Sequence, residues 1–168
     1  SFLAGQCEKV VGGFDFHNND SDPMDDHFHG THVAGIAASE GFPLGVAPGA
    51  KIVAYKVLGA KGSGLISAVI RAIERSTDPN NDGDFSDHLD VINLSLGRIC
   101  DMYSPDCGPD DDESTAIDNA VYLGVIAVVA AGNSGPGPMT IATPGTARNA
   151  ITVGATYKQD YGQTWCWS

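Results

Sequence analysis

The chain has 168 residues, of which 42% are hydrophobic and 18% charged, and its formal net charge at pH 7 is −12. This length suits one domain with a proper hydrophobic core, and the composition argues against wholesale disorder. The negative charge argues against a nucleic-acid partner, and the absence of a long apolar run argues against a membrane-spanning segment.

Short runs rich in β-branched residues alternate with segments of helical periodicity. Strands are expected at residues 9–14, 51–57, 91–95, 125–130 and 150–154. Helices are expected from His29 to Ser39, between Gly64 and Asp78, and between Asp112 and Gly124. The second helix has an apolar face that comprises Leu65, Ile66, Val69, Ile70 and Ile73. This alternation predicts one α/β unit with a mostly parallel sheet, in which strand 125–130 is central because it is apolar on both faces.

Polar segments separate these elements. The segment from Asp15 to Asp26 is predicted to be an acidic surface loop that includes Asp15 itself. Cys100 and Cys107 flank a second acidic loop and can form a local disulfide, which would contribute about 2–3 kcal/mol and imply an oxidising, extracellular setting. Sequence alone leaves the pairing of the four cysteines open, and the lack of C-x-x-C spacing argues against zinc.

His29 begins the most informative motif, His29-Gly30-Thr31-His32-Val33-Ala34-Gly35-Ile36. An imidazole that enters a tightly packed helix is well placed to act as a general base. A transition-metal site formed by His27, His29 and His32 is the rival interpretation, but their spacing of two and three differs from the i, i+4 pairing of helical zinc motifs.

Two strand ends carry further chemistry, because parallel sheets place their sites at the carboxyl ends of strands. Asn133 follows strand 125–130 in a glycine-flanked turn, where its amide can stabilise negative charge on a carbonyl oxygen or simply serve the turn. The segment Ser95-Leu96-Gly97 can offer free backbone groups to an extended peptide, or it can be the end of an ordinary core strand.

Together these motifs, with Gly45-Val46-Ala47-Pro48, resemble those of the subtilisin-like serine proteases in their order and spacing. The resemblance implies an incomplete α/β, three-layer subtilisin-like domain with a mostly parallel sheet, and a secreted endopeptidase that acts on polypeptide substrates without an organic cofactor. It implies that His29 is the general base and that Asn133 is the oxyanion donor. It assigns substrate binding to Gly62, Ser63, Gly64, Ser95, Leu96, Gly97, Ala130, Ala131 and Gly132.

The chain also departs from the family pattern. The aspartate motif and the Gly-Thr-Ser nucleophile motif are absent, so residues 1–168 resemble the middle portion of a partial peptidase catalytic domain, from the histidine motif through the oxyanion-hole motif. We expect this portion alone to be inactive, and its partners to be the remainder of the domain and a propeptide. Phe28 stands where the family usually has glycine. The alternative is a non-catalytic, calcium-stabilised, secreted binding module.

A calcium site is expected in the acidic loop that follows the second helix. Residues 78–84 alternate oxygen-bearing side chains with a glycine at the sixth place, like the start of an EF-hand loop, but the twelfth position is Leu89 instead of glutamate. The expected ligands are Asp78, Asn80, Asp82, Asp84 and Asp87. The alternative is an acidic turn without a metal.

Overall fold

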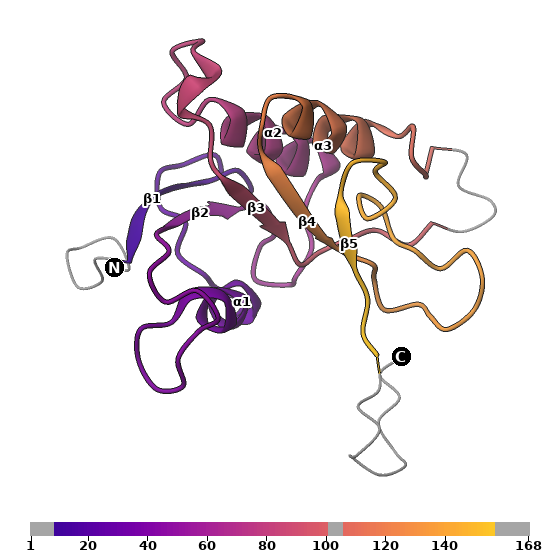
Figure 1. The fold of residues 1–168 in the computed structure, drawn as a ribbon, viewed down its shortest axis with the longest axis horizontal. Coiled ribbons are helices and arrows are strands. Elements are labelled where there is room, and N and C mark those ends of the chain that lie inside the picture. The colour runs from indigo at the N-terminus through magenta and orange to yellow at the C-terminus, as the bar shows by residue number, and fades with distance from the viewer. Residues whose placement is uncertain (1–8, 101–105, 157–168) are drawn as a thin grey trace. The chain divides into compact units, whose positions relative to one another are not determined.

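A computed structural model describes residues 9–100 and 106–156, which divide into two compact units at Ala72. The first unit contains strand β1 (Val10–Asp15), helix α1 (His29–Ala38) and strand β2 (Ile52–Lys56) (Figure 1). β1 and β2 pair in parallel, with Asp15 opposite Lys56 at the end of the ladder. Helix α2 (Ile66–Thr77) runs across the boundary between the units.

The second unit is built on a three-stranded parallel sheet. Strand β4 (Ile126–Ala130) lies between β3 (Val91–Leu94) and β5 (Ile151–Val153), so the predicted central position of this strand is confirmed. A short 3-10 helix (Phe85–Asp87) precedes β3, and helix α3 (Asp112–Tyr122) lies between β3 and β4 in the chain. All the expected strands occur close to their predicted positions, and every strand pair in the described ranges is parallel.

Helix α3 covers one face of this sheet. Ala127 and Val129 on β4 are each 1% exposed, and Ile117 and Ala120 on α3 are buried with them. This burial of alternate strand residues against one helical stripe is the usual way an α/β layer is stabilised. Ile126, on the opposite face of β4, is 50% exposed.

The apolar face predicted for α2 is partly wrong. Leu65 lies before the first helical turn and is 71% exposed, and Ile66 is 43% exposed. The buried positions of the helix are Ala68, Val69, Ala72, Ile73, Ser76 and Thr77. The buried face of α2 therefore contains small and polar residues that the predicted apolar face did not include.

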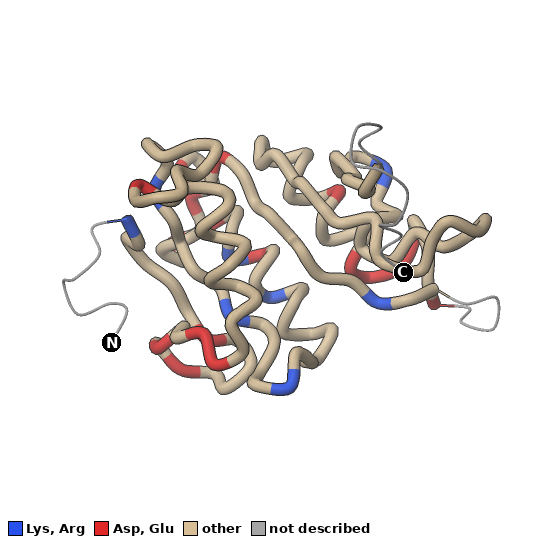
Figure 2. Tube along the Cα trace, turned by 90° about the horizontal axis from the view of Figure 1, so that it is seen from below, with Lys and Arg blue, Asp and Glu red and all other residues tan. Residues whose placement is uncertain are grey.

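Acidic residues outnumber basic ones by 21 to 9 in the sequence, and the same excess is visible along the trace in Figure 2. Within the described ranges, every helix is too short or too polar to cross a lipid bilayer.

Candidate active site

His29 is the first residue of α1 and is exposed, and the carboxylate of Asp25 holds the turn that leads into it. One oxygen of Asp25 accepts hydrogen bonds from the backbone N–H groups of His27 (2.8 Å) and Phe28 (3.0 Å). The other oxygen accepts from the N–H (2.7 Å) and the hydroxyl (2.6 Å) of Thr31. Since Phe28, the residue at the helix boundary, makes no side-chain cap, Asp25 takes over the capping function.

These four hydrogen bonds explain the acidity of Asp25. Partial burial raises the pKa of its carboxyl group, but the bonds from Thr31, His27 and Phe28 favour the charged form more strongly and bring the pKa to about 2. The group is therefore ionised at neutral pH, and its charge lies at the positive end of the α1 dipole.

A second anchor fixes the same loop to the sheet. The ammonium group of Lys56, at the end of β2, lies 2.9 Å from a carboxylate oxygen of Asp26 and 3.1 Å from one of Asp15. Asp15 is 1% exposed, so the prediction that it belongs to a surface loop is wrong. It ends β1, and the amide groups of Asn18 satisfy its carboxylate together with Lys56.

The far end of α1 is held through its backbone. The N–H groups of Val46 and Ala47 donate to the carbonyls of Ile36 and Ala37, which would otherwise be unpaired at a helix end. A side chain at Gly45 would lie 2.4 Å from the backbone nitrogen of Ser39. The helix was expected to be tightly packed, but Ala38 is its one buried residue. Its position is set by its two ends.

The predicted peptide-binding turn at Gly62, Ser63 and Gly64 belongs to the same unit as His29. The N–H of Gly62 donates to the carbonyl of Gly59, and the N–H of Gly59 donates to the carbonyl of Ser63, so the turn closes on itself. A Cβ on Gly62 would lie 3.1 Å from Nε2 of His27, two residues before His29. Gly62 also has a φ of +68°, which disfavours a side chain there.

In the second unit, Asn133 is exposed in a bend directly after β4. The chain turns at Gly132, whose φ is +95° and where a Cβ would lie 2.8 Å from the Cβ of Ala142. A left-handed conformation next to such a close contact requires glycine. The turn that presents the Asn133 amide is therefore defined by backbone geometry.

The same unit brings the other predicted substrate-binding segments together. Ala131 accepts a hydrogen bond from the N–H of Ala142 (2.9 Å) and donates to Val153 on β5 (2.8 Å). A Cβ on Gly97 would lie 3.0 Å from the Cβ of Ala142, which is 4% exposed. Ala142 thus contacts the segments Ser95-Leu96-Gly97 and Ala130-Ala131-Gly132 at once. Ala142 lies in a Gly/Pro-rich stretch, where no sequence pattern indicates a role in the site.

The predicted site residues therefore fall into two groups. His29 lies with Gly62, Ser63 and Gly64 in the first unit, and Asn133 lies with residues 95–97 and 130–132 in the second. Within each group the backbone contacts described above hold the segments in place.

The expected calcium ligands are engaged within their own loop. Asp78 accepts from the N–H groups of Asp82 and Gly83, and Asp82 accepts from the N–H of Asp84. The amide NH2 of Asn80 donates to Asp87 at 2.8 Å. In the described parts of the chain, no group of three or more His, Cys, Asp or Glu side chains could hold a metal ion. Neither the calcium site nor the three-histidine site therefore gains support.

The predicted disulfide is present, since Cys100 and Cys107 are joined with a Cα–Cα distance of 5.4 Å. Cys7 and Cys166 lie outside the described residues.

Comparison with known proteins agrees with this architecture. The chain is 44% identical over 153 residues to the minor extracellular protease Vpr of Bacillus subtilis, covering 86% of this chain and 17% of Vpr. It is 40% identical to subtilisin DY of Bacillus licheniformis, covering 88% of this chain and 50% of that protein. Among solved structures, Sphericase superposes with a TM-score of 0.73 at 35% identity, over 90% of this chain and 49% of that one.

The chain thus spans half or less of the length of these relatives. The solved relatives and the parallel sheets together indicate an incomplete α/β fold of the subtilisin type. A profile of the subtilase family matches residues 3–168, almost the whole sequence, and the chain therefore belongs to the subtilase family.

Proposed function

We propose that these 168 residues are the middle portion of the catalytic domain of a secreted serine endopeptidase. The observation that carries the proposal is the subtilase match over residues 3–168, which includes the histidine motif and the Asn133 turn. The disulfide between Cys100 and Cys107 supports secretion, because such bonds persist in oxidising compartments. The relative Vpr is likewise named an extracellular protease.

In this proposal His29 is the general base. A serine supplied by the part of the protein outside these residues attacks the peptide carbonyl carbon, and His29 takes the serine proton as the new C–O bond forms. His29 then gives that proton to the leaving amine when the C–N bond breaks. An aspartate, also from outside these residues, orients the imidazole. The 168-residue portion alone is therefore expected to be inactive.

Asn133 acts on the oxygen in the same proposal. Its side-chain NH2 donates a hydrogen bond to the carbonyl oxygen as that oxygen gains negative charge, and the Gly132 turn keeps the amide in place. Backbone groups of residues 62–64, 95–97 and 130–132 pair with the substrate as an extended strand. The remainder of the catalytic domain and a propeptide are the partners.

The test uses the natural full-length protein. A fluorophosphonate probe should label the wild type, and His29→Ala should abolish labelling while the fold is unchanged. Asn133→Ala should lower kcat about 100- to 1000-fold, the magnitude known for this donor in a subtilisin, with little change in KM. Asn119→Ala, on the exposed surface of α3, is the matched control and should leave kcat unchanged.

Failure of the wild type to react with the probe or to cleave a denatured protein would refute the peptidase proposal. A natural product that consists of these residues alone, and that binds peptides without cleaving them, would instead favour the non-catalytic binding module.

A further inference from the structure

Arg98 directly follows the predicted peptide-binding segment Ser95-Leu96-Gly97, and its backbone ties that segment to its neighbour. The N–H of Arg98 donates to the carbonyl of Thr143 at 2.8 Å, and the N–H of Thr143 donates to the carbonyl of Arg98 at 3.0 Å. This reciprocal pair is an isolated antiparallel bridge. Since Thr143 follows Ala142, the bridge determines how closely Gly97 approaches the Ala142 side chain.

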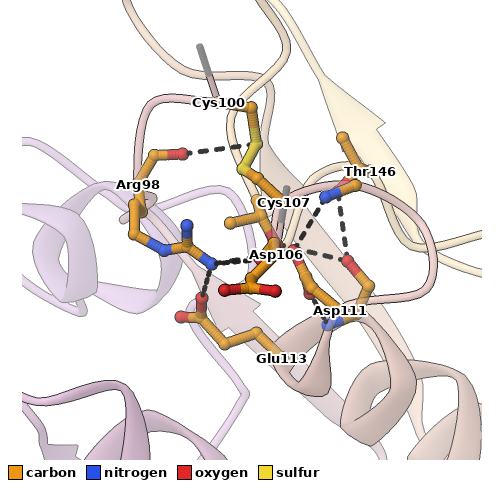
Figure 3. A network of polar contacts seen from close by, with 10 residues as sticks. Arg98, Cys100, Asp106, Cys107, Asp111, Glu113 and Thr146 are labelled. Atoms are coloured by element: carbon orange, nitrogen blue, oxygen red, sulfur yellow. Dashed lines mark hydrogen bonds and ion pairs between the residues drawn. A yellow bond between two sulfur atoms is a disulfide. The ribbon is translucent and has the colours of Figure 1, made fainter. Parts of the chain in front are cut away.

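The side chain of Arg98 reaches away from this bridge into a set of oxygen acceptors (Figure 3). Its Nη2 atom donates to the carbonyl of Asp106 at 3.2 Å and to the carboxylate of Glu113 at 3.4 Å, and it lies 3.8 Å from the carboxylate of Asp111. Asp106 is the neighbour of Cys107 in the disulfide, and Cys100 lies two residues after Arg98. One guanidinium group therefore connects the disulfide loop with the start of α3.

The acidic partners are fixed and largely removed from water. Glu113 is 3% exposed in the first turn of α3, and Asp111 is the N-cap, accepting from the N–H of Ser114 at 2.7 Å. Burial raises the pKa of Glu113, and the charge of Arg98 opposes that rise. Because a buried carboxylate without a cation is unfavourable, these acids resist any movement of the guanidinium.

A second tie runs from α3 to the other side of the bridge. The hydroxyl of Ser114 lies 3.2 Å from the hydroxyl of Thr143 and 3.1 Å from that of Thr146. Ser114 and Thr143 are both fully buried. The N-terminus of α3 thus holds both partners of the bridge, Arg98 through its guanidinium and Thr143 through its hydroxyl.

We propose that Arg98 is a positioning residue for peptide binding: its contacts with Asp106, Asp111 and Glu113 fix the bridge to Thr143 and so hold the Ser95-Leu96-Gly97 edge in its binding position. The inference rests on the proposed peptidase function for its kinetic readout. It requires no contact between Arg98 and the substrate. Loss of the guanidinium should loosen an edge that pairs with several substrate residues, while the chemistry at His29 and Asn133 continues.

The experiment compares Arg98→Met, Arg98→Lys and wild type in the natural full-length protein. Arg98→Met should raise KM for an extended peptide substrate about tenfold, equivalent to about 1.4 kcal/mol, with kcat within about twofold. The rate of labelling by a small fluorophosphonate, which does not need the extended edge, should stay within about twofold. Arg98→Lys should give an intermediate KM, because an ammonium group can still reach one of the acceptors.

Arg148→Met is the matched control. Arg148 also pairs with an aspartate, Asp110 at 2.8 Å, and donates to the carbonyl of Pro109, but it is exposed and lies outside the Arg98 contacts. It should leave KM unchanged. An unchanged KM in folded Arg98→Met, or an equal rise in Arg148→Met, would overturn the inference. If Arg98→Met does not fold, Arg98→Met with Glu113→Gln removes both charges and should show the same rise in KM.

A structural readout separates this inference from the peptidase proposal. Amide hydrogen exchange at Arg98 and Thr143 should accelerate at least tenfold in Arg98→Met, while exchange in the β3–β4 ladder stays as in the wild type. If the wild type proves inactive but this local change occurs, the peptidase proposal fails and the positioning role of Arg98 stands. Uniform acceleration throughout the second unit would mean that Arg98 serves only overall stability.

Discussion

Asp25 and Thr31 form a double hydrogen bond at the start of the histidine helix, in which both the N–H and the hydroxyl of Thr31 donate to one carboxylate oxygen. Because the other oxygen accepts from His27 and Phe28, this single side chain binds residues on both sides of His29. The general base of the proposed enzyme is therefore positioned by an acid four residues before it in the sequence.

Asp25→Asn should destabilise the protein at pH 7 by about 1–2 kcal/mol, because an amide has one acceptor oxygen and cannot accept through its NH2 group. The folded-state pKa of Asp25, about 2, lies below its ordinary value of 3.8. Its stabilising effect is thus fully present above about pH 4 and is lost as the pH falls toward 2. Denaturant unfolding at several pH values measures this difference.

Asp22→Asn is the control, because Asp22 is exposed and its carboxylate accepts a long 3.3 Å bond from the N–H of Met24. Its effect should be small at every pH. A wild-type advantage over Asp25→Asn that stays constant from pH 4 to pH 2 would show that the charge of Asp25 is not involved.

Phe28→Gly should stabilise the protein by about 0.5–1 kcal/mol. Phe28 has a φ of +81° and is 74% exposed, and its ring stacks on that of His27. A left-handed conformation costs a non-glycine residue about 1–2 kcal/mol, which outweighs the extra chain entropy of glycine in the unfolded state. Phe28→Ala keeps the strain and removes the ring, so it should be neutral or destabilising. Equal midpoints for the two variants would contradict the strain argument.

The sequence was sufficient for the features that local pattern determines. β-branched runs located the strands, and Gly124 marks the end of α3 with a φ of +113°. Asp15 was misassigned because a polar residue after Gly12 and Gly13 has the local pattern of a loop. Its burial depends on Lys56, 41 residues later, which no local pattern contains.

The candidate site shows the same division. His29 and Asn133 could be predicted as site residues because each lies in a motif of consecutive residues. The capping by Asp25 and the contact of Ala142 with Gly97 and Gly132 were not, because they depend on side-chain direction and on residues far apart in the chain.

Gly132→Ala should destabilise the protein by about 2–3 kcal/mol, since the new methyl group meets both an unfavourable φ of +95° and the Cβ of Ala142 at 2.8 Å. Ala142→Gly in the same chain should restore only the part due to the clash, which a double-mutant cycle measures. Gly137→Ala is the control in the same loop, because a Cβ there would make an ordinary 3.7 Å contact with Thr140. Equal losses of unfolding free energy in Gly132→Ala and Gly137→Ala would exclude both the φ of Gly132 and the Ala142 clash as causes.

Removal of calcium should not change the thermal midpoint through loop 78–87, because within the described residues no group of three or more His, Cys, Asp or Glu side chains could hold a metal ion. Differential scanning calorimetry with calcium and with EDTA measures this, in the wild type and in Asp82→Ala. A calcium-dependent rise in the wild type that Asp82→Ala abolishes would contradict this expectation and establish the site that the sequence pattern suggests. Asp112→Ala, an exposed acid on α3, controls for a general charge effect.

Loss of the disulfide should destabilise the second unit through the unfolded chain. The bond between Cys100 and Cys107 closes a short loop, and the loop-closure model gives a contribution of about 2–3 kcal/mol. Cys100→Ala with Cys107→Ala should therefore lower the unfolding free energy by about that amount, and a reducing agent should lower the wild type to the same level. Reducing agent should have no further effect on the double variant. If the reducing agent further destabilises the double variant, another cysteine pair stabilises the protein. If the reducing agent does not change the unfolding free energy of the wild type, the bond between Cys100 and Cys107 adds no stability. The backbone carbonyl of Asp106, next to Cys107, also accepts a hydrogen bond from Arg98. Adding Arg98→Met to the double cysteine variant should therefore lower the unfolding free energy by an amount that differs from the sum of the two separate losses.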